Sequence, residues 1–381
     1  MSTITPADLN IGPYHLSGES LVGAISPSIV IFEELMEANI DEMIRIAGSP
    51  ERLRPHCKTH KMAEVVRKLI ARGITKHKCA TFAEAEMLAQ AGAKDIFLAY
   101  TIVGPNIERT IRFRQQYPHV ALSVAADHPA PVTQLGQVAA AAGVEIDVVL
   151  DLDSGQHRTG AAGEAAAELY RLIAQTNGLR PAGLHLYDGQ NHQTDLEERR
   201  AAVKEVWRQG VSLRDQLVAE GLDVPRLVAG GSGSFPLYAE LNDPALELSP
   251  GTVIFFDEGY RSMFPDLNFT PAALLLTRVV SRPTPNRITL DLGYKAVAGD
   301  PPAGRRVTLP QLPDGKEVLH NEEHLVIETD QAEQFQPGDC LLAIPRHICP
   351  CSALHRSVFV AREGRIRGIW TVAARDRQLS I

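Results

Sequence analysis

The sequence predicts an α/β protein, with a (β/α)8 barrel over residues 33–262 followed by an all-β domain. The first observation is that short apolar or β-branched runs alternate with segments of helical length from residue 28 onward. The second is a change in the sequence pattern after Phe264, where helical periodicity ends and predicted strands separated by Pro and Gly follow. The nine strand candidates before that change are Ser28–Phe32, Pro55–Lys58, Cys79–Phe82, Asp95–Tyr100, Ala121–Ala126, Ile146–Asp153, Ala182–Tyr187, Arg226–Gly230 and Leu246–Phe256.

Helical segments lie between these strand candidates and have apolar residues near helical spacing. Examples are Met62–Ile70, Phe82–Ala91, Gly163–Thr176 and Leu196–Ala219. Repeated strand–helix units predict a parallel sheet. Eight units in a span of this length favour a closed barrel over an open doubly wound sheet, and the ninth strand can pair elsewhere.

The second domain is assigned residues 1–32 and 263–381. Its strand candidates are Ala273–Val280, Arg287–Leu292, His324–Glu328, Cys340–Ile344 and Val358–Ala361.

Composition excludes several classes of protein. The chain has 381 residues, which exceeds the usual size of a single core, and a formal net charge of -8 without a basic stripe. These numbers argue against nucleic acid as a partner. No segment approaches the length of a membrane span, and the N-terminus lacks the pattern of a signal peptide. Five scattered cysteines fit reduced thiols, so a cytoplasmic protein is expected.

Lys58 is the strongest candidate for a catalytic residue. It lies in Arg54-Pro-His-Cys-Lys-Thr-His-Lys61, at the predicted carboxyl end of a barrel strand, where barrel enzymes place their active sites. Neighbouring positive charge and burial both favour the neutral amine that forms an imine. The alternative is a basic loop on the surface.

A glycine-rich segment, Val228-Ala-Gly-Gly-Ser-Gly-Ser-Phe235, follows a late strand. Glycines let backbone N–H groups approach a phosphate, and the hydroxyls of Ser232 and Ser234 can add donors. The alternative is a tight structural turn. The first and last strands of a barrel are neighbours, so Lys58 and this segment together describe a pyridoxal-phosphate site.

A third candidate, His347 and Cys349, lies in the predicted β domain. In an extended segment, residues i and i+2 project to the same side, so an imidazole and a thiolate can bind one metal ion. Two protein ligands leave positions for a substrate hydroxyl, as a catalytic metal requires. Cys351 and His355 are possible extra ligands. The alternative is a buried cysteine beside a strand histidine.

With these motifs, the chain resembles the D-threonine aldolase and eukaryotic-type D-serine dehydratase family of alanine racemase-like, fold-type III pyridoxal-phosphate enzymes. The likeness begins at Ser28–Ile40, includes the Arg-Pro-His-x-Lys-x-His-Lys motif and runs to Gly364–Arg375.

The resemblance implies roles for particular residues. Lys58 would hold the cofactor, and Arg158, in Asp153-Ser-Gly-Gln-His-Arg-Thr-Gly160, would approach its pyridine nitrogen. His192 resembles the histidine that aldolases place near the substrate hydroxyl, although one residue is deleted before it; the alternative is a surface-loop histidine. The remaining implied positions are His56, Tyr187, Gly231, Ser232 and Gly233 for the cofactor and His347 and Cys349 for the metal.

The resemblance leaves the reaction open. Aldolases of this type often show His-x-Asp at the metal and dehydratases His-x-Cys, as here, while the flanking residues are more similar to aldolases. We therefore expect retro-aldol cleavage of β-hydroxy D-amino acids to glycine and an aldehyde. The alternative is a D-serine or 3-hydroxy-D-aspartate dehydratase, which would yield a 2-keto acid and ammonia.

A pyridoxal-phosphate carrier protein without enzymatic activity would also use a lysine and a phosphate site, but the predicted β domain argues against it. A racemase is conceivable as well, although it needs no metal for a hydroxyl. Thiolate ligation favours zinc, with manganese or magnesium as options. A homodimer is implied by the resemblance.

Overall fold

The computed structural model describes residues 6–381, which fall into two compact units. The barrel unit consists of residues 44–58, 63–251 and 376–381, and the β unit of residues up to 43, 59–62 and 252–375. Helix α2 (Glu33–Ala47) begins in the β unit and ends in the barrel unit. No helix in the described part of the chain combines the length and the apolar character that crossing a membrane requires.

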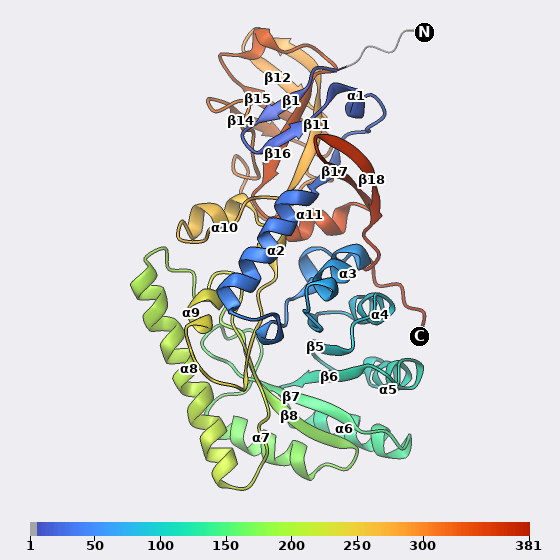
Figure 1. Ribbon diagram of the computed structural model, residues 1–381, viewed down its shortest axis with the longest axis vertical. Helices are drawn as coiled ribbons and strands as arrows, with labels where there is room; N and C mark the ends of the chain where they lie inside the picture. The colour runs from blue at the N-terminus through green and yellow to red at the C-terminus, as the bar shows by residue number, and fades with distance from the viewer. Residues whose placement is uncertain (1–5) are drawn as a thin grey trace. The chain divides into compact units, whose positions relative to one another are not determined.

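The barrel unit contains a parallel sheet of seven strands in the order β10-β9-β8-β7-β6-β5-β4 (Figure 1). The strands are β4 (Lys76–Cys79), β5 (Asp95–Thr101), β6 (Ala121–Ala126), β7 (Ile146–Asp151), β8 (Leu179–Leu186), β9 (Leu227–Ala229) and β10 (Leu246–Leu248). The helices are α3 (Ala63–Ala71), α4 (Phe82–Gln90), α5 (Asn106–Gln116), α6 (Pro129–Ala141), α7 (Gly163–Gln175), α8 (Leu196–Ala219) and α9 (Phe235–Ala239), with the 3-10 turn η1 (Pro50–Arg52).

Residues 53–56 join the two edges of this sheet. Leu53 pairs in parallel with Leu248 of β10, and His56 pairs in parallel with Lys78 of β4, so the sheet closes into the predicted barrel. The segment is not the regular strand Pro55–Lys58 that the sequence predicts. Pro55 has no N–H for a ladder hydrogen bond, and the chain turns at once into the 3-10 turn η2 (Cys57–Thr59).

The barrel interior is filled in layers. Its apolar layer consists of Phe97, Ala125, Val149, Ala182 and Val228. At the amino-terminal end of the strands, the guanidinium of Arg54 contacts Asp95 at 2.7 Å and Glu247 at 2.5 Å, and Lys76 contacts Glu247 at 2.9 Å. Burial by itself raises the pKa of Glu247, but Arg54 and Lys76 outweigh it and lower the pKa to about 2.

Replacing Arg54 with alanine should destabilise the protein by about 3–5 kcal/mol, because it leaves two carboxylates without their buried partner. Equilibrium urea unfolding of this variant measures the effect, with Arg112→Ala, on the exposed face of α5, as the control. In the wild type, the contribution of Glu247 should be complete above its ordinary pKa and be lost as pH falls toward about 2. Equal stability of the two variants would contradict the assignment.

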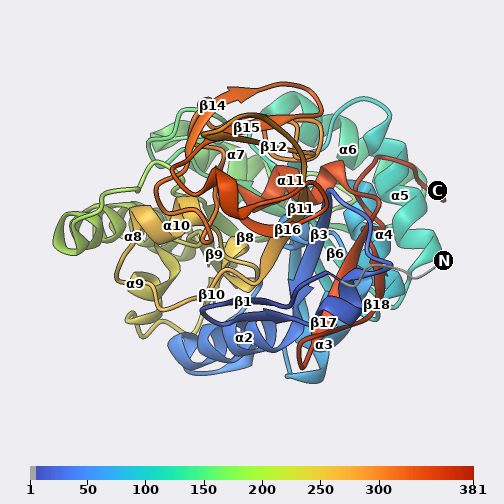
Figure 2. The same cartoon turned by 90° about the horizontal axis from the view of Figure 1, so that it is seen from above.

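The β unit contains a nine-stranded sheet with the path β14-β15-β12-β11-β3-β17-β18, and β16 pairs with β11 and β13 (Figure 2). Its strands are β3 (Ser28–Phe32), β11 (Ala273–Thr284), β12 (Arg287–Leu290), β13 (Val307–Thr308), β14 (Lys316–His320), β15 (Leu325–Glu328), β16 (Cys340–Pro345), β17 (Ser357–Arg362) and β18 (Arg365–Thr371). The smaller elements are β1 (Leu9–Ile11), β2 (Tyr14–Leu16), α1 (Gly18–Leu21), η3 (Thr252–Ile254), α10 (Glu258–Met263), η4 (Ala332–Gln334) and α11 (Ile348–Leu354). The ninth strand candidate that was free to pair elsewhere is β3, which lies between β11 and β17.

Candidate active site

Lys58 follows the segment that closes the barrel, and its side chain is half-buried. Its Nζ lies 5.6 Å from the centre of the Tyr187 ring, which follows β8. The backbone N–H of Lys58 donates a hydrogen bond to Nδ1 of His56 at 3.2 Å, which holds this imidazole beside the lysine. The structure therefore brings three of the predicted cofactor residues together.

Three cations surround the Tyr187 ring. Besides Lys58, the Nζ of Lys78 lies 5.7 Å and the Cζ of Arg158 lies 5.0 Å from the ring centre. Tyr187 itself is half-buried and Arg158 is exposed. Such a concentration of positive charge at the carboxyl ends of barrel strands is typical of a site for an anionic ligand.

Lys78, which sequence reasoning missed, is only 2% exposed inside the barrel. Burial, together with the charge of Lys58, lowers its pKa to about 7. Its Nζ lies 3.4 Å from Nε2 of His185, whose Nδ1 lies 2.7 Å from the carboxylate of Asp151. The other oxygen of Asp151 accepts a hydrogen bond from Thr159 at 2.8 Å. These residues form a polar chain across the barrel.

A β-bulge in β8 turns His185 into the barrel. The pairing of β7 with β8 shifts register at Gly183, which has a φ of +120°. A Cβ there would lie 2.2 Å from the backbone oxygen of Arg226, so this position requires glycine. Because side chains alternate, the extra residue places His185 on the same inner face as Ala182, edge-on to Phe97 at 5.2 Å. A glycine within a predicted strand was the available signal.

The glycine-rich segment forms a turn between β9 and α9. A Cβ on Gly231 would lie 3.3 Å from the Tyr187 ring, so the backbone passes directly beside that ring. Ser232 and Gly233 are buried in the turn, and the hydroxyl of Ser232 accepts a hydrogen bond from the N–H of Gly251 at 3.2 Å. The turn can therefore present backbone N–H groups to a phosphate beside Tyr187.

Asp188 holds this turn in place. The hydroxyl of Ser234 donates to Asp188 at 2.7 Å and accepts from the N–H of Gly231 at 3.0 Å. This hydroxyl therefore stabilises the turn, and its proton is not directed at a phosphate. Asn191 donates to the same carboxyl at 3.1 Å, and burial raises the pKa of Asp188. Gly189 lies close against the Tyr187 ring, since a Cβ there would lie 2.7 Å from a ring carbon.

His192 lies in the loop between β8 and α8, and its side chain is exposed. Its backbone N–H donates to the backbone oxygen of Gln190 at 3.0 Å. Its role near a substrate hydroxyl therefore stays a prediction.

In the β unit, His347 and Cys349 lie at a junction between strand and helix. His347 has an extended backbone and caps α11, while Cys349 lies in the first turn of that helix. The predicted extended segment is therefore wrong, because the chain enters a helix at Ile348. The two side chains nevertheless interact, because each shifts the pKa of the other.

Polar neighbours shift the pKa values of both side chains of this pair. Burial by itself lowers the pKa of His347, but Cys349 and Asp300 outweigh it and raise the pKa to about 9. Burial by itself raises the pKa of Cys349, but contacts with His347, Thr252 and Thr59 lower it. The thiolate is the form of cysteine that binds metals.

Asp300 orients the imidazole, since its carboxylate lies 2.6 Å from Nδ1 of His347 and leaves Nε2 for a metal. The hydroxyls of Thr59 and Thr252 lie 3.2 Å and 3.5 Å from the sulfur of Cys349. Thr59 is the residue after Lys58 in the chain.

Asp257 supports the same junction by accepting a hydrogen bond from the N–H of Ile348 at 3.0 Å. Cys351 donates a hydrogen bond to the backbone oxygen of His347 at 3.2 Å, and both Cys351 and His355 also contact the backbone of a neighbouring loop. Cys351 accepts a hydrogen bond from the N–H of Ala298 at 3.1 Å, and His355 lies 2.7 Å from the backbone oxygen of Ala296. They hold the loop that precedes Asp300.

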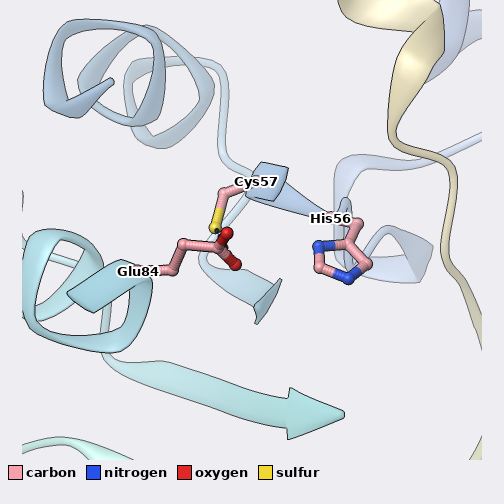
Figure 3. A group of neighbouring side chains, drawn as sticks. All are labelled: His56, Cys57 and Glu84. Atoms are coloured by element: carbon pink, nitrogen blue, oxygen red, sulfur yellow. Dashed lines mark hydrogen bonds between the residues drawn. The ribbon is translucent and has the colours of Figure 1, made fainter. Parts of the chain in front are cut away.

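A different group, His56, Cys57 and Glu84, has metal-binding atoms close together in the barrel unit (Figure 3). The Cys57 thiol lies beside the Glu84 carboxylate in Figure 3. The thiol donates a hydrogen bond to this carboxylate at 3.7 Å. That carboxylate accepts the N–H of Ala80 at 2.7 Å, and the N–H of Glu84 donates to Thr81, the N-cap of α4. Glu84 therefore acts as a helix-capping residue.

Comparisons with known proteins agree with this geometry. Residues 33–259 match the model of the alanine racemase N-terminal domain, and residues 272–361 match the model described as "Putative serine dehydratase domain". D-threonine aldolase from Arthrobacter sp. is 30% identical over 94% of both chains. The chain belongs to the D-threonine aldolase family.

Two further relatives are aldolases. 3-Hydroxy-D-aspartate aldolase from Paracoccus denitrificans is 27% identical over 92% of both chains. The crystal structure of D-threonine aldolase from Filomicrobium marinum is 26% identical, with a TM-score of 0.85 over 92% of this chain and 96% of that one. These comparisons confirm the predicted alanine racemase-like fold and the predicted class of enzyme, a lyase of the D-threonine aldolase family.

Proposed function

We propose that this lyase binds pyridoxal phosphate at Lys58 and a divalent metal at His347 and Cys349, and cleaves β-hydroxy D-amino acids to glycine and an aldehyde. The observation that carries the proposal is the group of Lys58, Tyr187 and Arg158 beside the glycine-rich turn. Its relatives named as aldolases support the reaction.

The residues of the barrel unit fit the cofactor. Lys58 would hold it as an imine, the turn at Gly231, Ser232 and Gly233 would bind its phosphate, and Arg158 would approach the pyridine nitrogen. The missing Cβ of Gly231 lets the turn pass directly beside the Tyr187 ring. When bound, pyridoxal phosphate supplies an electron sink for the charge that develops at the substrate Cα.

The donor set of the β unit fits a metal. The thiolate of Cys349 and Nε2 of His347 would be its protein ligands, and we favour zinc over manganese or magnesium because of the sulfur. With two protein ligands, such an ion would leave a position for a substrate hydroxyl and would supply the Lewis acidity that makes this hydroxyl more acidic.

In the proposed reaction, Lys58 would hold the cofactor between turnovers, and its amine would be free while the substrate is bound. His192 takes the proton of the β-hydroxyl as the Cα–Cβ bond breaks, which is the work of a general base. Asp300 would keep the imidazole of His347 in the orientation that binds the metal.

Dehydration is the second candidate, and two observations favour it. The metal pair contains a cysteine, which the resemblance associates with dehydratases, and residues 272–361 match a serine dehydratase domain. In that reaction, the released amine of Lys58 would remove the α-proton, and the metal would assist the departure of hydroxide.

Incubation with D-threonine deuterated at Cα decides between the two reactions. We expect glycine that retains the deuterium and a rate close to that of unlabelled substrate, because cleavage leaves the Cα–H bond intact. His192→Ala should lower the rate of cleavage about 10²–10⁴-fold, the usual contribution of a general base. His119→Ala, in the turn before β6, is the control. Keto acid and ammonia without glycine would contradict the aldolase and favour the dehydratase.

A further inference from the structure

We propose that Lys78 is a further cofactor-binding residue, whose ammonium group binds the phenolate oxygen of the cofactor ring. The inference rests on the proposed function, since it requires pyridoxal phosphate at Lys58.

The order of strands around the barrel supports this position. Around the closed sheet, β9 is followed by β10, then by residues 53–56, and then by β4. The glycine-rich turn follows β9, Lys58 follows residues 53–56, and Lys78 belongs to β4. The candidate phosphate site and Lys78 therefore lie on opposite sides of Lys58 around the barrel.

The substituents on the cofactor ring follow the same order. On its pyridine ring, the carbon that bears the aldehyde lies between the carbon that bears the phosphate arm and the carbon that bears the phenol. With the aldehyde at Lys58 and the phosphate at the turn after β9, the phenol faces β4. Of the two lysines of β4, Lys78 is buried and level with His56, whereas Lys76 contacts Glu247 at the amino-terminal end of the strands.

His185 positions the amine of Lys78. Because Nδ1 of His185 faces the carboxylate of Asp151 at 2.7 Å, Nδ1 carries the proton and Nε2 offers its lone pair to Lys78. Burial, with the charge of Lys78, lowers the pKa of His185, which keeps the ring neutral. The amine is thus held from one side while its other protons are available to a ligand.

Several charges face Lys78, and together they explain why an anion belongs beside it. Lys58 and Arg54 lower its pKa, while Asp151 and Asp188 raise it, and burial leaves the value at about 7. A phenolate would add a negative charge next to Lys78, which favours the ammonium form of this lysine.

Without a ligand, the buried position of Lys78 lowers the stability of the folded state. A buried lysine with a lowered pKa destabilises the folded state, because the unfolded chain binds its proton more tightly. Lys78→Met keeps the length of the side chain and removes the amine. We expect the cofactor-free variant to melt at the same temperature as the wild type or higher, which distinguishes a ligand-binding role from a structural one.

The test is titration of the full chain, stripped of cofactor, with pyridoxal phosphate, followed by visible absorbance. Lys78→Met should weaken binding about 10- to 100-fold, the size of one charge-assisted hydrogen bond. The imine of the variant should also lose its proton at a higher pH, because Lys78 no longer stabilises the phenolate. Lys94→Met, on the exposed surface, is the control.

A second probe identifies the anion. Pyridoxal phosphate methylated at the phenol oxygen should bind wild type and Lys78→Met equally. Unchanged affinity and imine titration in Lys78→Met would overturn the inference, and so would a variant in which only the KM of the substrate rises. Absence of any visible band in the wild type would instead refute the proposed function itself.

Discussion

Replacing Lys58 with alanine should abolish both the visible absorbance of the bound cofactor and all turnover. The physical reason is that an imine needs an amine at the cofactor aldehyde, and the amine of Lys58 lies beside Tyr187 and Arg158. Lys94→Ala, which removes an exposed lysine of the same unit, should change neither property.

The competing amine is Lys78, because burial lowers its pKa to about 7 and its Nζ lies at a similar distance from the Tyr187 ring. Borohydride reduction followed by peptide mass spectrometry assigns the adduct. Wild type should carry the reduced cofactor on Lys58 alone. An adduct on Lys78 in the wild type, or a single-site adduct in Lys58→Ala, would refute the assignment of the lysine.

Replacing His347 or Cys349 with alanine should remove metal-dependent turnover while leaving the cofactor absorbance largely intact. The two side chains form one donor pair, so the loss of either should release the metal, and the double variant should be no worse than the single ones. Metal content by elemental analysis, measured on the same samples as turnover and absorbance, separates the two functions.

The control is His324→Ala, which removes an exposed histidine of the β unit. Asp300→Asn provides a graded test, because it weakens the orientation of His347 without removing a ligand and should lower metal affinity about 10- to 100-fold. Wild-type activity of both ligand variants in buffer treated with a chelator would show that the metal site is elsewhere or is not needed.

Much of the site could be predicted from the sequence because its residues belong to contiguous motifs. The segment around Lys58 and the glycine-rich turn were placed together by one topological rule, that the first and last strands of a barrel are neighbours. The structure shows Lys58 and Gly231 beside the same tyrosine. The structure does not decide the role of His192, because its ring is exposed and only the chemistry of a substrate would use it.

By itself, the sequence determined the fold class and the two segments that contain the candidate lysine and the candidate metal ligands. Periodicity and short motifs are local properties of the chain. Only the tertiary structure decided that Lys78, His185 and Asp151 meet inside the barrel. Each comes from a different strand, and the alternation of β8 is interrupted by the bulge at Gly183, which no periodic pattern predicts. The tertiary structure also decided that His347 and Cys349 meet at the start of a helix, because the hydrogen bond from Ile348 to the buried Asp257, distant in the sequence, fixes where α11 begins.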